Sequence, residues 1–307
     1  MTDSILQEIA SDTGLLPSQV LAIAKTAPLR YKVFSVPKRT GGMRTLAQPA
    51  REVKALQYSL LGKIQDGLPI HDAVTAYQVG CSIAKNARRH AGAAFLLKMD
   101  FENFFPSIFE HDFVRHVKKY HGREFSDDDL ETMSRILFWA PDRKRPLQLC
   151  IGAPTSPFIS NTLLHDFDCI ISSEMTKIGV TYTRYADDLA FSTRQPNVLA
   201  GVANLVGEVV DKLEYPTLRL NVKKTVHASR ATRRVVTGIV ITPKGELSVG
   251  RDKKRLIRSM WHRASLGLLS VDEVDKLNGL VNFVESIEPG YANRLRRVGT
   301  RNRDGGS

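Results

Sequence analysis

The sequence has few cysteines and no long apolar run. Cys81, Cys150 and Cys169 form no CxxC pair, so neither a disulfide framework nor a zinc cluster is expected. No apolar run approaches the roughly 18 residues that cross a bilayer. The first residues also lack the basic and apolar regions of a secretory signal. We therefore expect a cytoplasmic protein with no membrane partner.

The composition also excludes a disordered or fibrous chain. Hydrophobic residues make up 42% of the 307 residues and charged residues 25%, which is typical of a folded globular protein. No internal repeat, long linker or low-complexity block interrupts the chain. We therefore expect one continuous assembly of packed subdomains.

Positive charge is concentrated in one part of the chain. The sequence holds 44 Lys and Arg against 32 Asp and Glu, a net charge of +12. Between Leu218 and Arg263, 13 Lys and Arg stand against two acids, so +11 of that charge lies in 46 residues. Either a solvated charged face or a polyphosphate partner would explain such a run.

Hydrophobic periodicity predicts a mixed α+β fold. Helices are predicted at about 5–26, 53–64, 197–213, 252–264 and 271–287, and strands at 31–36, 93–100, 181–185, 189–192 and 235–242. Gly41 and Gly42 are expected to supply the positive φ angles of a hairpin turn after the first strand.

Three carboxylates lie at predicted strand ends. Asp100 ends a mostly apolar strand, and Asp187 and Asp188 are expected at the tip of a short hairpin. Singly, such residues are common caps and turn residues. On neighbouring strands, however, they would converge and repel one another unless cations lie between them. Two Mg²⁺ ions there would suit oxygen ligands and would stabilise the entering and leaving oxygens of a phosphoryl transfer.

Six short motifs follow the order found in one enzyme family. Tyr185-Ala186-Asp187-Asp188 resembles the YxDD motif of reverse transcriptases, and 99–107 (MDFENFFPS) resembles their first catalytic motif. The segments 152–157 (GAPTSP) and 220–225 (LNVKKT) are similar to the motifs that flank the catalytic hairpin in chain order. The strings 86–90 (NARRH) and 236–238 (VTG) are similar to the NAxxH and VTG elements of retron reverse transcriptases.

The resemblance implies a right-hand polymerase, with an antiparallel palm sheet, fingers and a helical thumb. Fingers with an N-terminal helical segment are expected at 1–98 and 112–150, the palm at 99–111 and 151–245, the thumb at 246–302 and a flexible tail at 303–307. It also makes Asp100, Asp187 and Asp188 the catalytic, metal-binding triad for two Mg²⁺ ions, with the backbone carbonyl of Phe101 as a further ligand.

Further residues match nucleotide-binding positions of the family. Lys38 and Arg44 match fingers residues that clamp the triphosphate, as an ammonium and a guanidinium can do. Phe105 matches the aromatic residue that excludes a ribose 2′-hydroxyl, although core packing would also explain it. Gly152 opens the motif before the catalytic hairpin, and Lys224 is a candidate for protonating the leaving pyrophosphate.

Three positions leave alternatives open. Lys223 could donate the proton in place of Lys224, and Arg39 is equally consistent with a solvated surface residue. Ile151 stands where the family usually has Gln, which removes a polar contact near the incoming nucleotide.

The resemblance also implies contacts with RNA and with the template-primer. For His90 two roles stay open, an RNA contact or a supporting position behind the site, and either is favoured over a metal ligand. The full set of expected residues is Asn86, His90, Thr237, Gly238, Arg251, Lys253, Lys254, Arg255 and Arg258. The last five lie where a thumb helix should grip phosphates. Trp261 could stack on a base, but a core position is favoured.

The implied activity is RNA-directed DNA polymerisation from deoxynucleoside triphosphates. The retron resemblance implies a dedicated structured noncoding RNA as template, priming from an internal 2′-hydroxyl, a branched RNA-linked DNA product (msDNA) and anti-phage defence alongside an effector protein. The alternatives are an intron-type or other defence reverse transcriptase, a palm-fold nucleotide cyclase, which the absence of a GGDEF string disfavours, and a non-catalytic RNA-binding scaffold.

Overall fold

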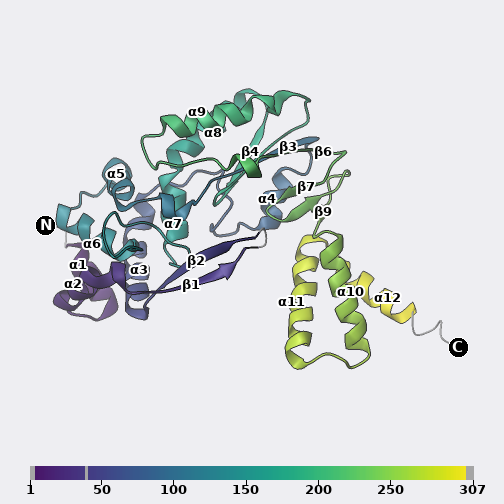
Figure 1. Ribbon diagram of the computed structural model, residues 1–307, viewed down its shortest axis with the longest axis horizontal. Coiled ribbons are helices and arrows are strands. Elements are labelled where there is room, and N and C mark those ends of the chain that lie inside the picture. The colour runs from purple at the N-terminus through teal and green to yellow at the C-terminus, as the bar shows by residue number, and fades with distance from the viewer. Residues whose placement is uncertain (1–3, 39–40, 302–307) are drawn as a thin grey trace.

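The computed structural model describes residues 4–38 and 41–301. Figure 1 shows N-terminal helices at one end, a sheet with covering helices in the middle and three C-terminal helices projecting at the other end. Arg39 and the predicted tail 303–307 lie outside the described residues. None of the described helices is both long and apolar enough to cross a bilayer.

The predicted fingers region begins with packed helices. They are α1 (Ile5–Thr13), α2 (Pro17–Thr26), α3 (Arg51–Ile64) and α6 (Asp127–Leu137). The start of α1 is stabilised by a capping box, in which Ser4 and Gln7 each accept a hydrogen bond from the backbone N–H of the other. Buried Ile5 of α1 and Leu56 of α3 belong to the same core. The single helical segment predicted at 5–26 is therefore two helices.

A hairpin of β1 (Tyr31–Pro37) and β2 (Met43–Pro49) extends from these helices, as Figure 1 shows. Tyr31 pairs with Pro49, and Pro37 pairs with Met43. At the tip, the Lys38 N–H donates to the Gly42 carbonyl over 2.9 Å. Most side chains of β1 are exposed, so the hairpin presents a surface to solvent. The hairpin predicted from the sequence is confirmed.

The middle of the molecule is a four-stranded antiparallel sheet in the order β4, β5, β3, β6. Its strands are β3 (Phe95–Asp100), β4 (Thr181–Tyr185), β5 (Asp188–Thr193) and β6 (Val226–Ser229). The boundary between fingers and palm that was predicted at residue 98 falls within β3, which lies between β5 and β6 in this sheet.

The two faces of the sheet pack against different elements, because side chains alternate along a strand. In β3, Leu97 and Met99 join the core on one face, whereas Leu96 joins a second core with Ala87. Besides the N-terminal helices, the first core includes residues of α5 (Glu110–Tyr120), α7 (Ser156–Leu163), α8 (His165–Lys177) and α9 (Val202–Lys212). Ala87 lies in α4 (Ile83–Arg89) on the other side.

A second, three-stranded sheet follows the palm. It consists of β7 (Arg234–Val236), β8 (Ile239–Ile241) and β9 (Leu247–Ser248). The prediction of a single strand at 235–242 is therefore wrong. Thr237 and Gly238 have φ angles of 47° and 80°, so they form a two-residue turn that splits the segment into a hairpin.

Three helices form the predicted thumb, α10 (Arg251–Ser265), α11 (Val271–Ile287) and α12 (Tyr291–Arg301). Ile257 of α10, Val284 of α11 and Tyr291 of α12 are buried in one core. Trp261 packs against this core, which confirms its favoured position. The same core contains Val236 and Ile239, so the thumb helices share their interior with the second sheet.

Candidate active site

The three predicted catalytic carboxylates come together at one edge of the palm sheet. Asp100, the last residue of β3, is the register partner of Asp188, the first residue of β5. Asp187 lies in the turn between β4 and β5, and its carbonyl accepts a hydrogen bond of 3.1 Å from the Phe101 N–H. Strand pairing thus joins segments that are far apart in the sequence.

The turn is shorter than the sequence suggests. Tyr185 pairs directly with Asp188, so the loop consists of Ala186 and Asp187 alone. Ala186 has a φ angle of 55°, in the left-handed region that residues with a side chain seldom adopt. Asp188 therefore projects from a strand and Asp187 from a strained turn.

Burial and mutual repulsion disfavour negative charge here. Burial, followed by the charges of Asp100 and Asp188, raises the pKa of Asp187 to about 6. The pKa of Asp188 is raised as well, chiefly by burial. The Lys224 ammonium donates to Asp100 Oδ1 over 2.7 Å, and although partial burial opposes its charge, this contact raises the pKa of Lys224. Lys224, rather than Lys223, thus supplies positive charge to this site.

The donor set fits a hard divalent cation. Asp100, Asp187 and Asp188 offer oxygen ligands, and their crowding leaves negative charge that Lys224 balances only in part. Across the described residues, no three His, Cys, Asp or Glu side chains already form a metal-binding cluster.

A buried ion pair that the sequence analysis did not identify supports the catalytic turn. The Arg184 and Asp168 side chains are both 0% exposed, and Arg184 Nη2 lies 2.6 Å from Asp168 Oδ2. The guanidinium also donates to the Ala186 carbonyl over 3.3 Å and to the Asn161 carbonyl over 3.2 Å. The signal was an arginine inside a predicted strand, directly before the YxDD motif.

Tyr77 is a second residue that the sequence analysis did not identify. Its ring centroid lies 6.2 Å from that of Tyr185, beside the catalytic turn. The pKa of Tyr77 is raised by partial burial and then by the charges of Tyr185 and Asp187, whereas Arg44 lowers it. The phenol therefore lies within electrostatic range of both the catalytic turn and the fingers hairpin.

The predicted nucleotide-binding residues lie on several different elements. Lys38 and Arg44 are exposed on the β1–β2 hairpin, and the Phe105 ring lies 5.3 Å from that of Phe104, with part of its surface exposed. Gly152 has a φ angle of 125°, and an added Cβ would lie 2.7 Å from the Ala47 carbonyl oxygen. Gly152 therefore lets its loop approach β2 closely.

Asn86 and His90 do not lie where RNA contact was expected. Both side chains are 1% exposed. The His90 ring is hydrogen-bonded to Ser192 Oγ at 2.8 Å and to Thr183 Oγ1 at 2.7 Å, and Thr183 donates to Asn86 Oδ1. The structure thus corrects their predicted role, because burial leaves no surface for RNA and the pair attaches α4 to the palm sheet.

The two retron-type strings lie against one another. Thr237 Oγ1 donates to the Ile83 carbonyl at the start of α4 over 3.3 Å. Gly238 is exposed in the same turn. In Figure 1, α4 lies between the palm sheet and the β7–β8 hairpin. These strings therefore connect the palm to the second sheet.

The predicted thumb contacts fall into two groups. Arg251, Arg255 and Arg258 are exposed on α10. Lys254 instead pairs with Glu288 at 2.5 Å, and Lys253 Nζ lies 4.4 Å from the Phe283 ring centroid. The three arginines therefore present exposed positive charge on this helix, whereas the two lysines contact α11 and the chain after it.

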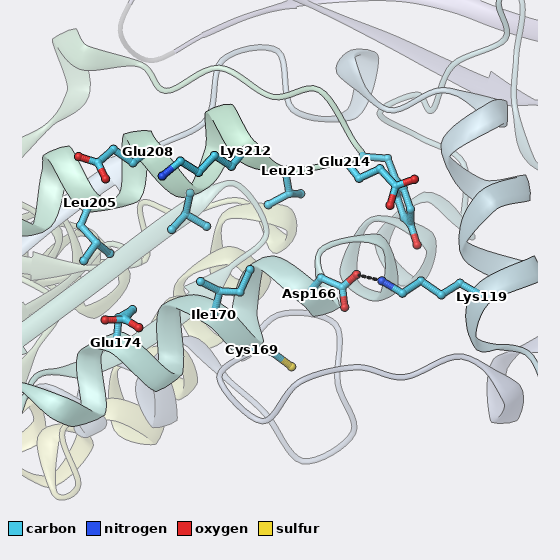
Figure 2. A pocket seen from close by; sticks show the side chains of 12 residues that line it. Lys119, Asp166, Cys169, Ile170, Glu174, Leu205, Glu208, Lys212, Leu213 and Glu214 are labelled. Atoms are coloured by element: carbon cyan, nitrogen blue, oxygen red, sulfur yellow. Dashed lines mark hydrogen bonds and ion pairs between the residues drawn. The ribbon is translucent and has the colours of Figure 1, made fainter.

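A groove of about 580 Å³ lies elsewhere, between α8 and α9 (Figure 2). Ile170 and Leu205 line it together with Glu174, Glu208 and other carboxylates. It contains none of the residues predicted for the site. Four carboxylates and two lysines, Lys119 and Lys212, line it, so its excess of negative charge disfavours phosphates.

The paired strands that carry the acids, the hairpin beside them and the helical domain beyond define a polymerase of right-hand architecture. The chain matches the family described as "Reverse transcriptase (RNA-dependent DNA polymerase)" over residues 36–253. It is 37% identical over 269 residues to the retron Ec83 reverse transcriptase of Escherichia coli, covering 87% of this chain and 86% of that protein. The chain belongs to the reverse transcriptase family, within its retron type, and is an RNA-directed DNA polymerase.

Two other relatives are also described as retron reverse transcriptases. The retron Ec86 reverse transcriptase of Escherichia coli is 30% identical over 292 residues, which cover 94% of this chain and 87% of that protein. The retron Mx162 reverse transcriptase of Myxococcus xanthus is 33% identical over 284 residues, 84% of this chain and 58% of that protein. Among solved structures, telomerase from Candida albicans with a telomeric RNA fragment aligns at 12% identity and a TM-score of 0.49, over 87% of this chain and 56% of that one.

Proposed function

We propose that this enzyme copies a cognate structured noncoding RNA into msDNA, a single-stranded DNA that stays joined to the RNA through the 2′-hydroxyl that primed its synthesis. In this proposal the product acts in anti-phage defence with an effector protein. The observation that carries it is the similarity to retron reverse transcriptases over 87% of the chain, which includes the carboxylate site.

In this proposal the carboxylates, Lys224 and Arg44 have separate chemical roles. Asp100, Asp187 and Asp188 would hold two Mg²⁺ ions, which when bound would activate the primer hydroxyl and neutralise the triphosphate. Lys224 Nζ, 2.7 Å from Asp100, carries a proton that it would give to the leaving pyrophosphate. Arg44, exposed on the hairpin, would also bind the triphosphate.

The thumb would supply affinity for the RNA. Arg251, Arg255 and Arg258 lie on one exposed helix and would contact phosphates, which gives binding that weakens with salt. Selection of one RNA requires contacts to its shape, its unpaired bases or its 2′-hydroxyls. The connection between α4 and the β7–β8 hairpin lies between the palm and this helix, so it would set their relative position.

Isolation of the bound nucleic acid tests the proposal. The protein is purified from its native host, and the nucleic acid that accompanies it is treated separately with RNase, DNase and a 2′,5′-debranching enzyme. We expect a short DNA that loses its attached RNA on debranching. Cells that carry Asp187→Asn should yield the RNA without the DNA, because the metal site loses a charged ligand.

Two outcomes would contradict the proposal in different ways. If the unchanged protein is isolated with RNA but without DNA, the result would favour a non-catalytic RNA-binding scaffold. DNA without a 2′,5′ linkage would leave the polymerase activity intact and exclude the branched product. Phage plating on hosts with and without Asp187→Asn tests the defence role separately. Equal plating efficiency on the two hosts would contradict that role.

A further inference from the structure

The segment before α4 is fastened to the strand that carries the catalytic turn. The Arg184 N–H donates to the Ala73 carbonyl over 2.9 Å, and the Thr75 N–H donates to the Arg184 carbonyl over 2.8 Å. This short stretch therefore extends the palm sheet beyond β4. Tyr77 follows Thr75 by two residues, so its backbone is anchored close to the strand that leads into the catalytic turn.

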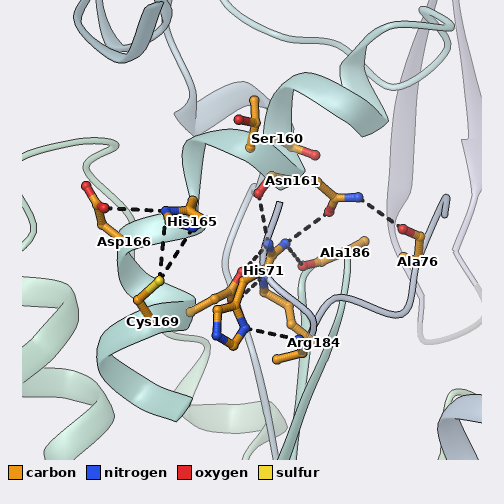
Figure 3. A network of polar contacts seen from close by, with 12 residues as sticks. His71, Ala76, Ser160, Asn161, His165, Asp166, Cys169, Arg184 and Ala186 are labelled. Atoms are coloured by element: carbon orange, nitrogen blue, oxygen red, sulfur yellow. Dashed lines mark hydrogen bonds and ion pairs between the residues drawn. The ribbon is translucent and has the colours of Figure 1, made fainter. Parts of the chain in front are cut away.

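The buried Arg184 network holds Tyr77 and the catalytic turn together. Asn161 Nδ2 donates to the Ala76 carbonyl over 3.0 Å, while the Asn161 Oδ1 accepts from Arg184 over 3.2 Å. Arg184 also donates to the Ala186 carbonyl. The residue before Tyr77 and the residue before Asp187 thus share one buried support (Figure 3).

Tyr77 combines a costly backbone conformation with an exposed ring. Its φ angle is 59°, which a residue with a side chain seldom adopts. Its side chain is nevertheless 56% exposed, so core packing does not explain the choice of an aromatic residue. Strained backbone held by buried contacts clusters at ligand-binding positions.

We propose that the exposed face of Tyr77 packs against a nucleotide at the polymerisation site, either the end of the primer or the incoming deoxynucleotide. The ring centroid lies 6.2 Å from that of Tyr185 in the catalytic hairpin. The charge of Asp187 raises the pKa of the phenol and the charge of Arg44 lowers it. Sugars and bases both offer a face that an aromatic ring stacks on, with little dependence on sequence. The inference rests on the proposed catalytic role of Asp187.

Substitutions that keep the backbone conformation test this contact. Gly and Asn both tolerate a positive φ angle, so Tyr77→Gly and Tyr77→Asn should fold and remove the ring. Tyr77→Phe keeps the ring and removes only the hydroxyl. The matched control is Tyr58→Ala, because the Tyr58 side chain is 61% exposed on α3.

The readouts are the KM for deoxynucleotides, the Kd for an RNA template with a DNA primer and the melting temperature. We expect Tyr77→Gly and Tyr77→Asn to weaken one of the two binding constants by about tenfold, with an unchanged melting temperature. Tyr77→Phe and Tyr58→Ala should stay within about twofold of the unchanged enzyme. A change in KM identifies the incoming nucleotide as the partner of the Tyr77 ring. A change in Kd identifies the end of the primer as that partner.

The contact is excluded when Tyr77→Gly and Tyr77→Asn leave both constants unchanged, or when they change no more than Tyr58→Ala does. Asp187→Asn, assayed in parallel, separates this result from the catalytic assignment. Normal polymerisation by Asp187→Asn contradicts the proposed site itself. An inactive Asp187→Asn with unchanged kinetics in the Tyr77 variants contradicts only the contact.

Discussion

At the scale of single residues, Arg184 and Asp168 form an ion pair that is fully removed from water. Asp168→Asn would leave the guanidinium inside the protein without its counter-charge, next to the catalytic turn. Loss of one partner from a buried pair costs about 3–5 kcal/mol. We expect the free energy of unfolding, measured by urea titration, to fall by that amount.

Asp166→Asn is the matched control, two residues away on the same helix. Asp166 pairs with Lys119 at 2.7 Å, but the two side chains are 32% and 48% exposed. Screening by water limits such a pair to about 1 kcal/mol or less. Equal losses from the two substitutions would mean that the buried network contributes nothing particular to stability.

At the scale of elements, His90 makes the attachment of α4 to the palm sheet depend on pH. Burial, followed by the charge of Arg89, lowers the pKa of His90 to about 4, from 6.5 in an unfolded chain. Between these values the unfolded chain binds a proton that the folded protein excludes. Stability is therefore full above pH 6.5 and falls as the pH decreases toward 4, by roughly 2–3 kcal/mol from this residue.

Comparison with His90→Gln isolates that contribution. His116, whose pKa is also lowered to about 4, acts in the same direction, whereas the raised pKa of Asp187 acts in the opposite direction. Both groups are present in the two proteins, so their effects cancel in the difference. Urea titrations at pH 7 and pH 4.5 should show a smaller loss for His90→Gln, and identical losses would exclude His90 as the cause.

At the scale of the whole molecule, the exposed arginines of α10 should govern affinity for nucleic acid. Changing the exposed residues Arg251, Arg255 and Arg258 to Glu would remove the three proposed phosphate contacts and add repulsion. We expect weaker RNA binding. The slope of log Kd against the logarithm of the salt concentration should also be smaller by roughly 2–3. Filter binding over a range of salt concentrations measures both quantities.

The control places the same charge change on other helices. Lys25 of α2, Lys177 of α8 and Lys212 of α9 are exposed and lie outside α10. Changing all three to Glu lowers the net charge equally. If this variant loses as much affinity as the α10 variant, net charge rather than the thumb helix determines binding.

Local patterns predicted much of the fold and the centre of the site. The hairpin of β1 and β2 and the strand that ends at Asp100 follow from residues close together in the chain. The division of 235–242 into β7 and β8 was missed, because Thr237 rather than glycine takes the first positive φ angle of the turn. Asn86 and His90 were predicted to contact RNA, since polar residues in a motif look alike whether they face solvent or a buried strand.

What the sequence determined by itself is the set of elements and the acids at their ends, because periodicity and turn chemistry act over a few residues. Only the tertiary structure decided which distant segments share a boundary. It placed Asp188 opposite Asp100, buried Arg184 against Asp168 and left Tyr77 exposed beside the catalytic turn. The physical reason is that burial and hydrogen-bond partners depend on packing between elements, which no short stretch of sequence contains.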